Sequence, residues 1–245
     1  MVGKRLAIAV LVGLAGVLAP GLAAAQAPIA TAVQVIPATR SELGGAAVTI
    51  LTGAELFAGQ RIETDTNGEV QIIFADQTRM VIGPNSALII ETYLMQNPTT
   101  LGEFTVNALG GSFRFITGNG PSDAYRINTP TGAITVRGTE FDFLVDWLTG
   151  VVQVFLFEGE VVLCPLEGPC VTISEDCEAG TIARTDLAAV VDGAIDLLDL
   201  AGGFPMVFDQ DGLLTEFQLG TADRCVSELR DEVRELTRPR PISPA

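Results

Sequence analysis

Short apolar runs alternate with turn residues through most of the 245-residue chain, and this rhythm restricts the fold more than any other feature of the sequence. Asn67-Gly68, a dipeptide typical of two-residue hairpin turns, separates two such runs, and Gly83-Pro84 marks another turn. Strands that recur about every 8–10 residues are typical of an all-β sandwich, barrel or solenoid. We therefore predict an all-β fold with no helix before residue 180.

Alternating polarity locates the individual strands, because successive side chains of a strand point to opposite faces. Gly110-Gly111 divides one long apolar region into two predicted strands. The strands are predicted over 32–36, 47–51, 69–74, 78–82, 87–91, 104–109, 112–117, 133–136, 139–145, 151–157, 160–163 and 171–173.

The stretch 128–145 combines a turn, a bend and a regular strand. Thr129-Pro130 predicts a turn, since proline fixes φ and keeps the preceding residue extended. Gly138 follows a short strand, at a point where the backbone must bend or be approached closely. Beyond the bend, one face of the strand carries Phe141, Phe143 and Val145, and the other carries Glu140, Asp142 and Leu144.

This stretch resembles the T-P-x5-V-R-G-T-x-F signature of the FecR family, the periplasmic domain of bacterial cell-surface signalling regulators. Residues 62–88 resemble the opening half of the family domain, so the resemblance spans about 33–163. It implies a twisted, β-solenoid-like stack of short strands and a non-enzymatic role in signalling or in binding a ligand or partner. The matching signature residues are Thr129, Pro130, Val136, Arg137, Gly138, Thr139 and Phe141.

The composition excludes several classes of function. A formal net charge of -16 disfavours nucleic acid as a partner, since phosphate binding needs a basic surface. The chain has no histidine, and its only lysine is Lys4. Histidine-based catalytic triads, histidine metal cages and lysine Schiff bases are therefore excluded from the exported chain. We predict no catalytic residue, no cofactor and no metal.

The N-terminus predicts export. Lys4 and Arg5 precede an apolar stretch over 6–22, and Ala23-Ala24-Ala25 forms a small-residue cleavage site before Gln26. This arrangement is typical of a Sec-type signal peptide over 1–25, with an uncleaved anchor as the alternative. We expect a periplasmic or secreted bacterial protein with no later membrane span. The complete regulators of the resembled family have an anti-sigma segment and a transmembrane helix at this place, so we expect a module without its own anti-sigma segment.

Three parts are predicted along the chain: the signal peptide 1–25, a FecR-like all-β domain over 32–184, and a C-terminal extension over 185–245. The extension differs in pattern, because apolar residues recur at helical spacing over 193–200 and 222–237. Thr221 is the predicted cap of the second helix. Alternating arginine and proline from residue 238 ends that helix, and the end of the chain is expected to be disordered.

Four cysteines allow three disulfide pairings, and an exported chain is expected to form disulfides. Cys164 and Cys170 flank a turn between two short strands, and residues facing each other across a hairpin have the Cα separation that a disulfide needs. We therefore prefer Cys164–Cys170, which leaves Cys177–Cys225 to tie the extension to the β domain. A zinc site made by all four cysteines is disfavoured because the spacings contain no C-x2-C pair.

Two residues are candidate contacts with an unidentified protein or cell-envelope partner. Trp147, the only tryptophan, lies at a predicted loop tip over 146–150, where partner contact and packing over the adjacent hairpin are both plausible roles. Arg137 is the one charged signature residue. It suits contact with a ligand carboxylate or partner, but we expect it to bury its stem and donate to neighbouring turn carbonyls.

Acidic residues supply the alternative function, an enzyme acting on cell-wall or polysaccharide material. Glu140 and Asp142 share a strand face, and Glu158 and Glu160 are close in sequence. Paired carboxylates catalyse glycoside hydrolysis. Because alternating acids on a β domain are usually a hydrated surface, we interpret these residues as a solvated outer face.

The sequence Asp209-Gln210-Asp211-Gly212, followed by Glu216, has some features of a calcium-binding loop. The glycine comes too early and the final acid is wrongly spaced for an EF-hand. We therefore predict a plain turn.

Overall fold

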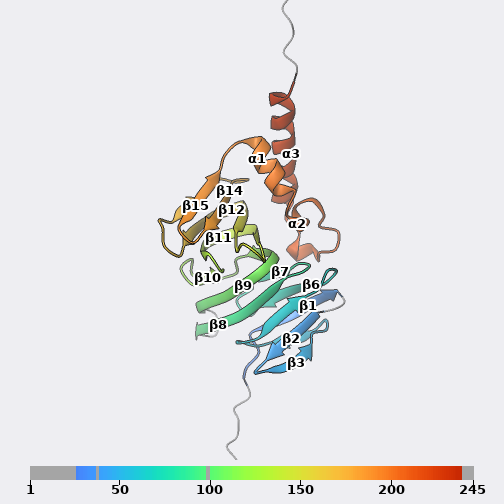
Figure 1. Cartoon of the computed structure of the whole chain (residues 1–245). Helices are drawn as coiled ribbons and strands as arrows, with labels where there is room; N and C mark the ends of the chain where they lie inside the picture. The colour runs from blue at the N-terminus through green and yellow to red at the C-terminus, as the bar shows by residue number, and fades with distance from the viewer. Residues whose placement is uncertain (1–25, 37–38, 98–99, 239–245) are drawn as a thin grey trace, which may run out of the picture.

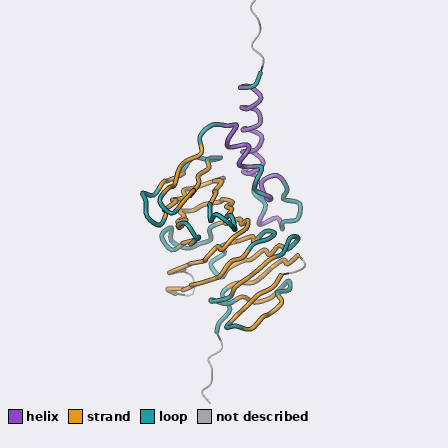
Figure 2. The backbone as a smooth tube through the Cα atoms, viewed as in Figure 1, coloured by secondary structure: helices purple, strands orange, loops and turns teal. Residues whose placement is uncertain are grey.

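The computed structural model of the chain describes residues 26–36, 39–97 and 100–238. Within these ranges the chain is mostly β-strand, and the helices all follow the last strand (Figure 1, Figure 2). α1 and α3 stand side by side at one end of the molecule (Figure 1). The signal peptide predicted over 1–25 and the disordered end predicted over 239–245 lie outside the described residues.

The helices are α1 (Ala194–Ala201), α2 (Pro205–Phe208), the 3-10 helix η1 (Thr215–Phe217) and α3 (Gly220–Leu236). None of these described helices is both long enough and apolar enough to cross a membrane. The strands are β1 (Ala30–Ile36), β2 (Thr39–Leu43), β3 (Ala46–Thr49), β4 (Ala54–Leu56), β5 (Arg61–Thr64), β6 (Glu69–Phe74), β7 (Arg79–Ile82), β8 (Ala87–Asn97), β9 (Thr100–Ile116), β10 (Tyr125–Asn128), β11 (Gly132–Val145), β12 (Val152–Pro165), β13 (Val171–Ile173), β14 (Ala179–Arg184) and β15 (Leu187–Val191).

Hydrogen bonds join the fifteen strands into one sheet that is not closed. Its main path runs β15-β14-β12-β11-β10-β9-β7-β6-β1-β4, and a side branch leads from β9 through β8, β5 and β2 to β3. Paired strands are antiparallel throughout the described residues, except that β9 and β10 run parallel. The all-β prediction is confirmed up to the helical extension, and the solenoid-like stacking stays a prediction.

Three strands that the sequence divides in two are continuous in the structure. Gly111, Gly138 and Gly159 lie inside β9, β11 and β12 with φ of 108°, 61° and 97°, values that residues with a Cβ rarely adopt. Next to Gly138, the pairing of β11 with β12 shifts register, as in a β-bulge. The predicted bend at Gly138 is confirmed, whereas the predicted strand break at Gly111 is wrong, because the ladder continues past the glycine.

One face of the bent sheet encloses the main hydrophobic core. Phe113 on β9 and Phe143 on β11 are register partners, and their stacked rings have centroids 4.8 Å apart. Phe115 and Phe141 form the next aromatic pair along the same two strands. All four rings are buried together with Val145, so the predicted apolar face of this strand is confirmed.

The opposite face of β12 packs against the C-terminal helices. Phe155 and Phe157 belong to a second buried core, which also contains Phe204, Cys225 and Leu229 from the extension. Because alternate residues of a strand point to opposite faces, one strand supplies both cores. The extension is therefore fastened to the sheet by apolar packing.

The extension contains both predicted helices, as α1 and α3. The predicted cap at Thr221 is wrong: α3 already begins at Gly220 and has no side-chain cap, and the Thr221 hydroxyl lies 3.5 Å from Glu140 Oε2 on β11. β15 pairs with β14 and carries the sheet on to Val191, beyond the expected domain boundary. The division at residue 184 therefore stays a prediction.

Two disulfides are present, in the pairing predicted from the sequence. Cys164 pairs with Cys170 at a Cα separation of 4.2 Å, and Cys177 pairs with Cys225 at 5.2 Å. Cys177 lies in the turn before β14 and Cys225 lies in α3, so the second bridge fixes the longest helix to the sheet. All four cysteines are paired, which excludes the four-cysteine zinc site.

Candidate functional site

The loop between β11 and β12 presents two large apolar side chains to solvent. Asp146 organises this loop, since its Oδ1 accepts hydrogen bonds from the Leu148 N–H at 3.1 Å, the Thr149 N–H at 2.8 Å and the Thr149 hydroxyl at 2.7 Å. These bonds hold the pKa of Asp146 below its usual range, and the bond from the Thr149 hydroxyl has the largest effect. At the tip, Trp147 is 53% exposed and Leu148 is 96% exposed. The predicted loop tip is confirmed.

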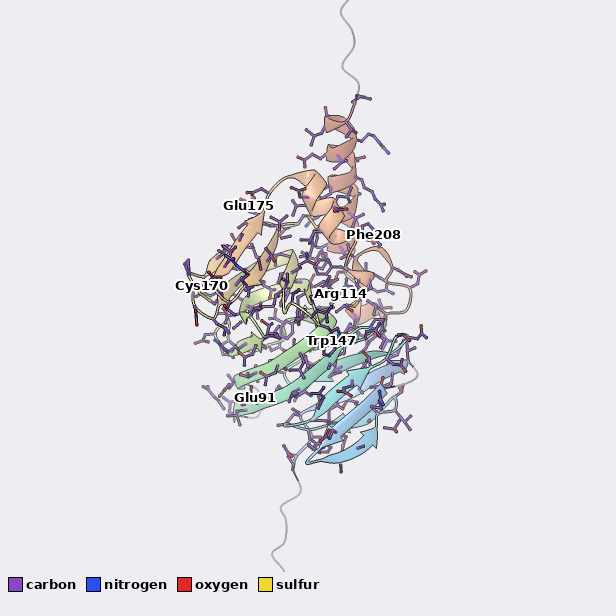
Figure 3. The ribbon with its side chains drawn as sticks, viewed as in Figure 1. Glu91, Arg114, Trp147, Cys170, Glu175 and Phe208 are labelled. Atoms are coloured by element: carbon purple, nitrogen blue, oxygen red, sulfur yellow. A yellow bond between two sulfur atoms is a disulfide. The ribbon has the colours of Figure 1, made fainter. Side chains whose placement is uncertain are left out.

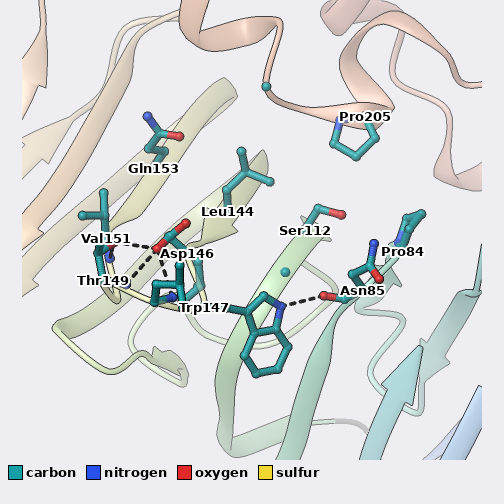
Figure 4. Close-up of a pocket in the computed structure, with 14 residues that line it drawn as sticks. Pro84, Asn85, Ser112, Leu144, Asp146, Trp147, Thr149, Val151, Gln153 and Pro205 are labelled. Atoms are coloured by element: carbon teal, nitrogen blue, oxygen red, sulfur yellow. Dashed lines mark hydrogen bonds between the residues drawn. The ribbon is translucent and has the colours of Figure 1, made fainter. Parts of the chain in front are cut away.

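The Trp147 ring is held in place although half of it is exposed. Its Nε1 donates to the backbone oxygen of Asn85 at 2.9 Å (Figure 4). The ring also covers Gly110 on β9, where an added Cβ would lie 2.2 Å from an indole carbon. One part of the indole therefore packs and another part faces solvent. An aromatic side chain fixed in this way loses little entropy when a partner binds it.

An open pocket of about 790 Å³ lies beside the indole. The loop that carries Trp147 forms one side of it, and Pro205 at the start of α2 lies across the opening, with Leu144 between them (Figure 4). Fourteen residues line the pocket, and Asp146 is the one ionisable side chain among them. The lining of the pocket is thus mainly apolar and carries a single negative charge, that of Asp146.

Polar groups of the lining leave hydrogen-bonding capacity unused. The side-chain amides of Asn85 and Gln153 line the pocket and make no hydrogen bond to any described residue. The Ser112 side chain, only 5% exposed, has a hydroxyl without a partner among the described residues. A few polar groups in an apolar recess are typical of a ligand or partner site.

The FecR-like signature lies directly against the loop that carries Trp147. The Thr131 hydroxyl donates to the Gly150 carbonyl at 2.7 Å, and a Cβ on Gly150 would lie 3.2 Å from Pro130. Thr129 closes the signature turn, because its hydroxyl donates to the Gly132 carbonyl at 2.9 Å and accepts from the Gly132 N–H at 3.1 Å. The turn of the signature stretch, through Pro130 and the neighbouring Thr131, therefore contacts the base of the exposed loop.

Arg137 lies outside the pocket, and its side chain is more exposed than predicted. Its side chain is 66% exposed, and its Nη1 lies 3.4 Å from Glu160 Oε1 on the neighbouring strand. The prediction of a buried stem that donates to turn carbonyls is wrong, because Arg137 points to the solvent side of β11, opposite the buried Val136. A contact with a partner stays a prediction for Arg137.

Asp142 is buried, which corrects the interpretation of a solvated acidic face. Asp142 Oδ1 accepts from Arg114 Nε at 2.7 Å and Oδ2 accepts from Arg114 Nη2 at 2.9 Å, with both side chains fully buried. Arg114 lies near the centre of the molecule (Figure 3), and the same guanidinium donates to the carbonyls of Met206 and Phe217 in the extension. The extension covers this part of the sheet, and its sequence carries no signal of where it docks.

The remaining acids do not assemble around the pocket. Glu140 and Glu158 are register partners on β11 and β12. Burial, and then the nearby charge of Glu158, raises the pKa of Glu140. Glu160 pairs with Arg137 instead. The lining of the pocket beside Trp147 includes neither these acids nor Asp142.

The sequence with some features of a calcium loop forms a turn. Asp209 Oδ1 accepts from the Asp211 N–H at 3.1 Å, a local side-chain bond that is typical of turns. The predicted plain turn is confirmed. The described part of the chain contains no group of three or more histidine, cysteine, aspartate or glutamate side chains that could hold a metal ion.

Several pocket residues escape sequence reasoning. Leu148 follows Trp147 in a predicted loop, so two adjacent large apolar residues in a turn are the signal that identifies it. Asn85 and Pro205 come from distant parts of the chain, and the sequence contains nothing that pairs them with Trp147. Only the folded arrangement reveals the pocket.

Residues 60–162 match the family model described as FecR protein. The chain carries a FecR domain. The match begins next to β5 and ends within β12, so the FecR domain includes the signature, the bend at Gly138 and the loop that carries Trp147. The helices of the extension lie outside it.

Comparisons with other proteins add little beyond the FecR domain. A search of curated proteins found no match. Two crystal structures of a "putative anti-sigma factor" from Parabacteroides distasonis ATCC 8503 are similar to the chain at 16% and 15% sequence identity, with TM-scores of 0.43 and 0.44. Each similarity covers 58% of this chain, and 65% or 64% of the other. This chain thus spans slightly less than two thirds of the length of those structures.

Proposed function

We propose that this protein is a non-enzymatic, extracytoplasmic signalling module that binds a protein or cell-envelope partner through Trp147, Leu148 and the adjoining pocket. The observation that carries this proposal is the loop tip, where two large apolar residues, 53% and 96% exposed, stand on a loop whose base is held by Thr131 in the signature stretch. Exposure of adjacent tryptophan and leucine side chains to water is unfavourable in the unbound protein. Such exposure is typical of contact surfaces.

The proposed location is the periplasm or the exterior of a bacterial cell, after export by a Sec-type signal peptide over 1–25. Two disulfides support an oxidising compartment, because disulfides persist outside the cytosol and are rare within it. The absence of free cysteines among the described residues fits the same environment.

The distribution of acids supports a binding role over hydrolysis of polysaccharide. Asp142 forms a buried ion pair with Arg114 beneath the extension. Glu140 lies opposite Glu158 on the neighbouring strand and does not line the pocket. Glycoside hydrolases need two carboxylates that flank one bound sugar. With Asp146 as its one ionisable lining residue, the pocket beside Trp147 lacks that pair.

Affinity capture from an envelope extract tests this proposal. The tagged wild-type chain should retain a specific protein, and Trp147→Ala should weaken capture by about tenfold or more, as expected for a central aromatic anchor. Gly110→Ala should have a similar effect, because a Cβ there displaces the indole while the tryptophan is still present. Leu51→Ala, at an apolar position 68% exposed in another loop, is the matched control. Equal capture by all four proteins would refute the proposed contact surface.

A further inference from the structure

The pocket beside Trp147 has the chemistry of a groove for a proline-rich segment. The indole offers a flat, partly exposed aromatic surface against which a proline ring can stack. Pro84 and Pro205 add rigid apolar walls. Proline-rich segments bind in aromatic-lined grooves, because their extended helix is preformed and loses little entropy on binding.

The hydrogen-bonding groups of the pocket also suit such a ligand. A polyproline II helix has no internal hydrogen bonds, and each proline offers a carbonyl acceptor but no N–H. A groove for this ligand needs free donors. The side-chain amides of Asn85 and Gln153, both labelled in Figure 4, supply them, since neither amide makes a hydrogen bond to any described residue.

The chain itself contains a segment of this kind, directly after α3. With three residues per turn, a polyproline II helix places Arg238, Pro241 and Pro244 along one edge. The segment carries two arginines and no acid in a chain of net charge -16. Its charge is opposite to that of Asp146, the one charged side chain of the pocket. The full segment is Arg238-Pro239-Arg240-Pro241-Ile242-Ser243-Pro244.

We propose that the Trp147 pocket of one copy of this chain binds segment 238–244 of a second copy, with a proline on the indole and an arginine next to Asp146. The proposal rests on the binding role of the pocket argued above. It makes the chain self-associating through a head-to-tail contact, in which each copy offers one pocket and one segment.

The length of the segment favours a second copy over the same chain. α3 has 17 residues, so it carries Arg238 about 25 Å along its axis. It points away from the sheet (Figure 1). The six residues beyond Arg238 span about 19 Å as polyproline II, which is shorter than the helix that they would have to retrace.

Fluorescence titration tests the contact directly, because Trp147 is the only tryptophan of the chain. A synthetic peptide of residues 238–244 is added to the full chain at nanomolar concentration, where copies are dissociated. The emission of Trp147 should shift in a saturable way, and added salt should weaken the binding of this basic peptide. The same peptide with Pro241→Ala and Pro244→Ala should bind about tenfold more weakly. These changes are confined to the peptide, so they cannot unfold the protein.

Sedimentation of the full chain provides the second measurement. The wild-type protein should associate as its concentration rises, and the chain with Pro241→Ala and Pro244→Ala should stay monomeric at the same concentrations. An unchanged Trp147 emission at millimolar peptide, or equal association of both chains, would overturn the proposal.

The failure of this inference can be told apart from the failure of the proposed function. If the peptide has no effect but Trp147→Ala still abolishes capture of another envelope protein, the pocket binds a different partner and only the inference falls. If the peptide has no effect and capture does not depend on Trp147, both fall.

Discussion

Arg114 on β9 and Asp142 on β11 form a bidentate ion pair in which both side chains are fully buried. The guanidinium also lies over the Phe157 ring, 5.6 Å from its centroid, and donates to backbone carbonyls of the extension. One residue thus joins the FecR domain to α2 and η1 of the extension. This arrangement links the stability of the extension to that of the sheet.

Arg114→Ala should lower the free energy of unfolding by about 3–5 kcal/mol, because it leaves the Asp142 carboxylate buried without its partner. The double variant Arg114→Met with Asp142→Leu should recover part of this loss, since it removes both charges together. Recovery should be incomplete, because the carbonyls of Met206 and Phe217 lose their donor. Urea unfolding of the three proteins measures these differences. If Arg114→Ala were as stable as the wild type, the stabilising role of the ion pair between Arg114 and Asp142 would be contradicted.

The two disulfides should contribute unequally. The bridge between Cys177 and Cys225 spans 48 residues and that between Cys164 and Cys170 spans 6. The loop-entropy model then assigns about 4 kcal/mol to the long bridge and about 2 kcal/mol to the short one. Serine pairs at each bridge, compared by thermal unfolding, should show the larger loss for the long bridge. The reverse order would show that the extension adds little to the stability of the sheet.

Gly159 should tolerate alanine less well than Gly138. Both have positive φ, which for alanine costs about 1–2 kcal/mol. Space around Gly138 is open, whereas a Cβ on Gly159 would lie 2.2 Å from the Gly138 carbonyl oxygen. Gly159→Ala should therefore cost about 1–3 kcal/mol more than Gly138→Ala, through overpacking. Equal melting temperatures of the two variants would show that the bulge relaxes freely.

Glu140→Gln should stabilise the protein at neutral pH and have little effect in acid. Burial and the charge of Glu158 raise the folded-state pKa of Glu140 above its ordinary value of 4.5. Its charged form is therefore unfavourable in the folded state, and this penalty is present above the folded pKa and absent below the unfolded pKa. Melting curves should show a higher Tm for the variant than for the wild type at pH 7, and similar Tm values for the two proteins at pH 4. The exposed Glu55→Gln is the control, and equal effects of both variants would refute the assignment.

Local patterns predicted much of the sheet, because alternation and turn residues act over a few positions. The shared face of Phe141 and Phe143 and the bend at Gly138 follow from side-chain period and glycine chemistry alone. The continuity of β9 through Gly111 did not follow, since a glycine at positive φ ends a strand in one context and bends it in another.

The site could be predicted only in part, since long-range packing decides it. Trp147 in a short loop was recognisable as a candidate contact residue, but the pocket needs Asn85 and Pro205, which the fold brings from distant segments. Asp142 has the sequence appearance of a surface acid, and the docking of the extension buries it against Arg114. Neither contact produces a periodic pattern of residue types in the sequence.

Site-specific photo-crosslinking in intact cells tests the central claim most directly. Leu148, 96% exposed beside Trp147, is replaced with a photoreactive phenylalanine derivative, and Leu51 in the loop between β3 and β4 serves as the control position. Light should join position 148 to one defined protein of the cell envelope or to a second copy of this chain. That product should disappear when Trp147→Ala is added, and position 51 should not form it. Identical products from both positions, or a product at 148 that persists without Trp147, would contradict the account of this loop as the binding surface.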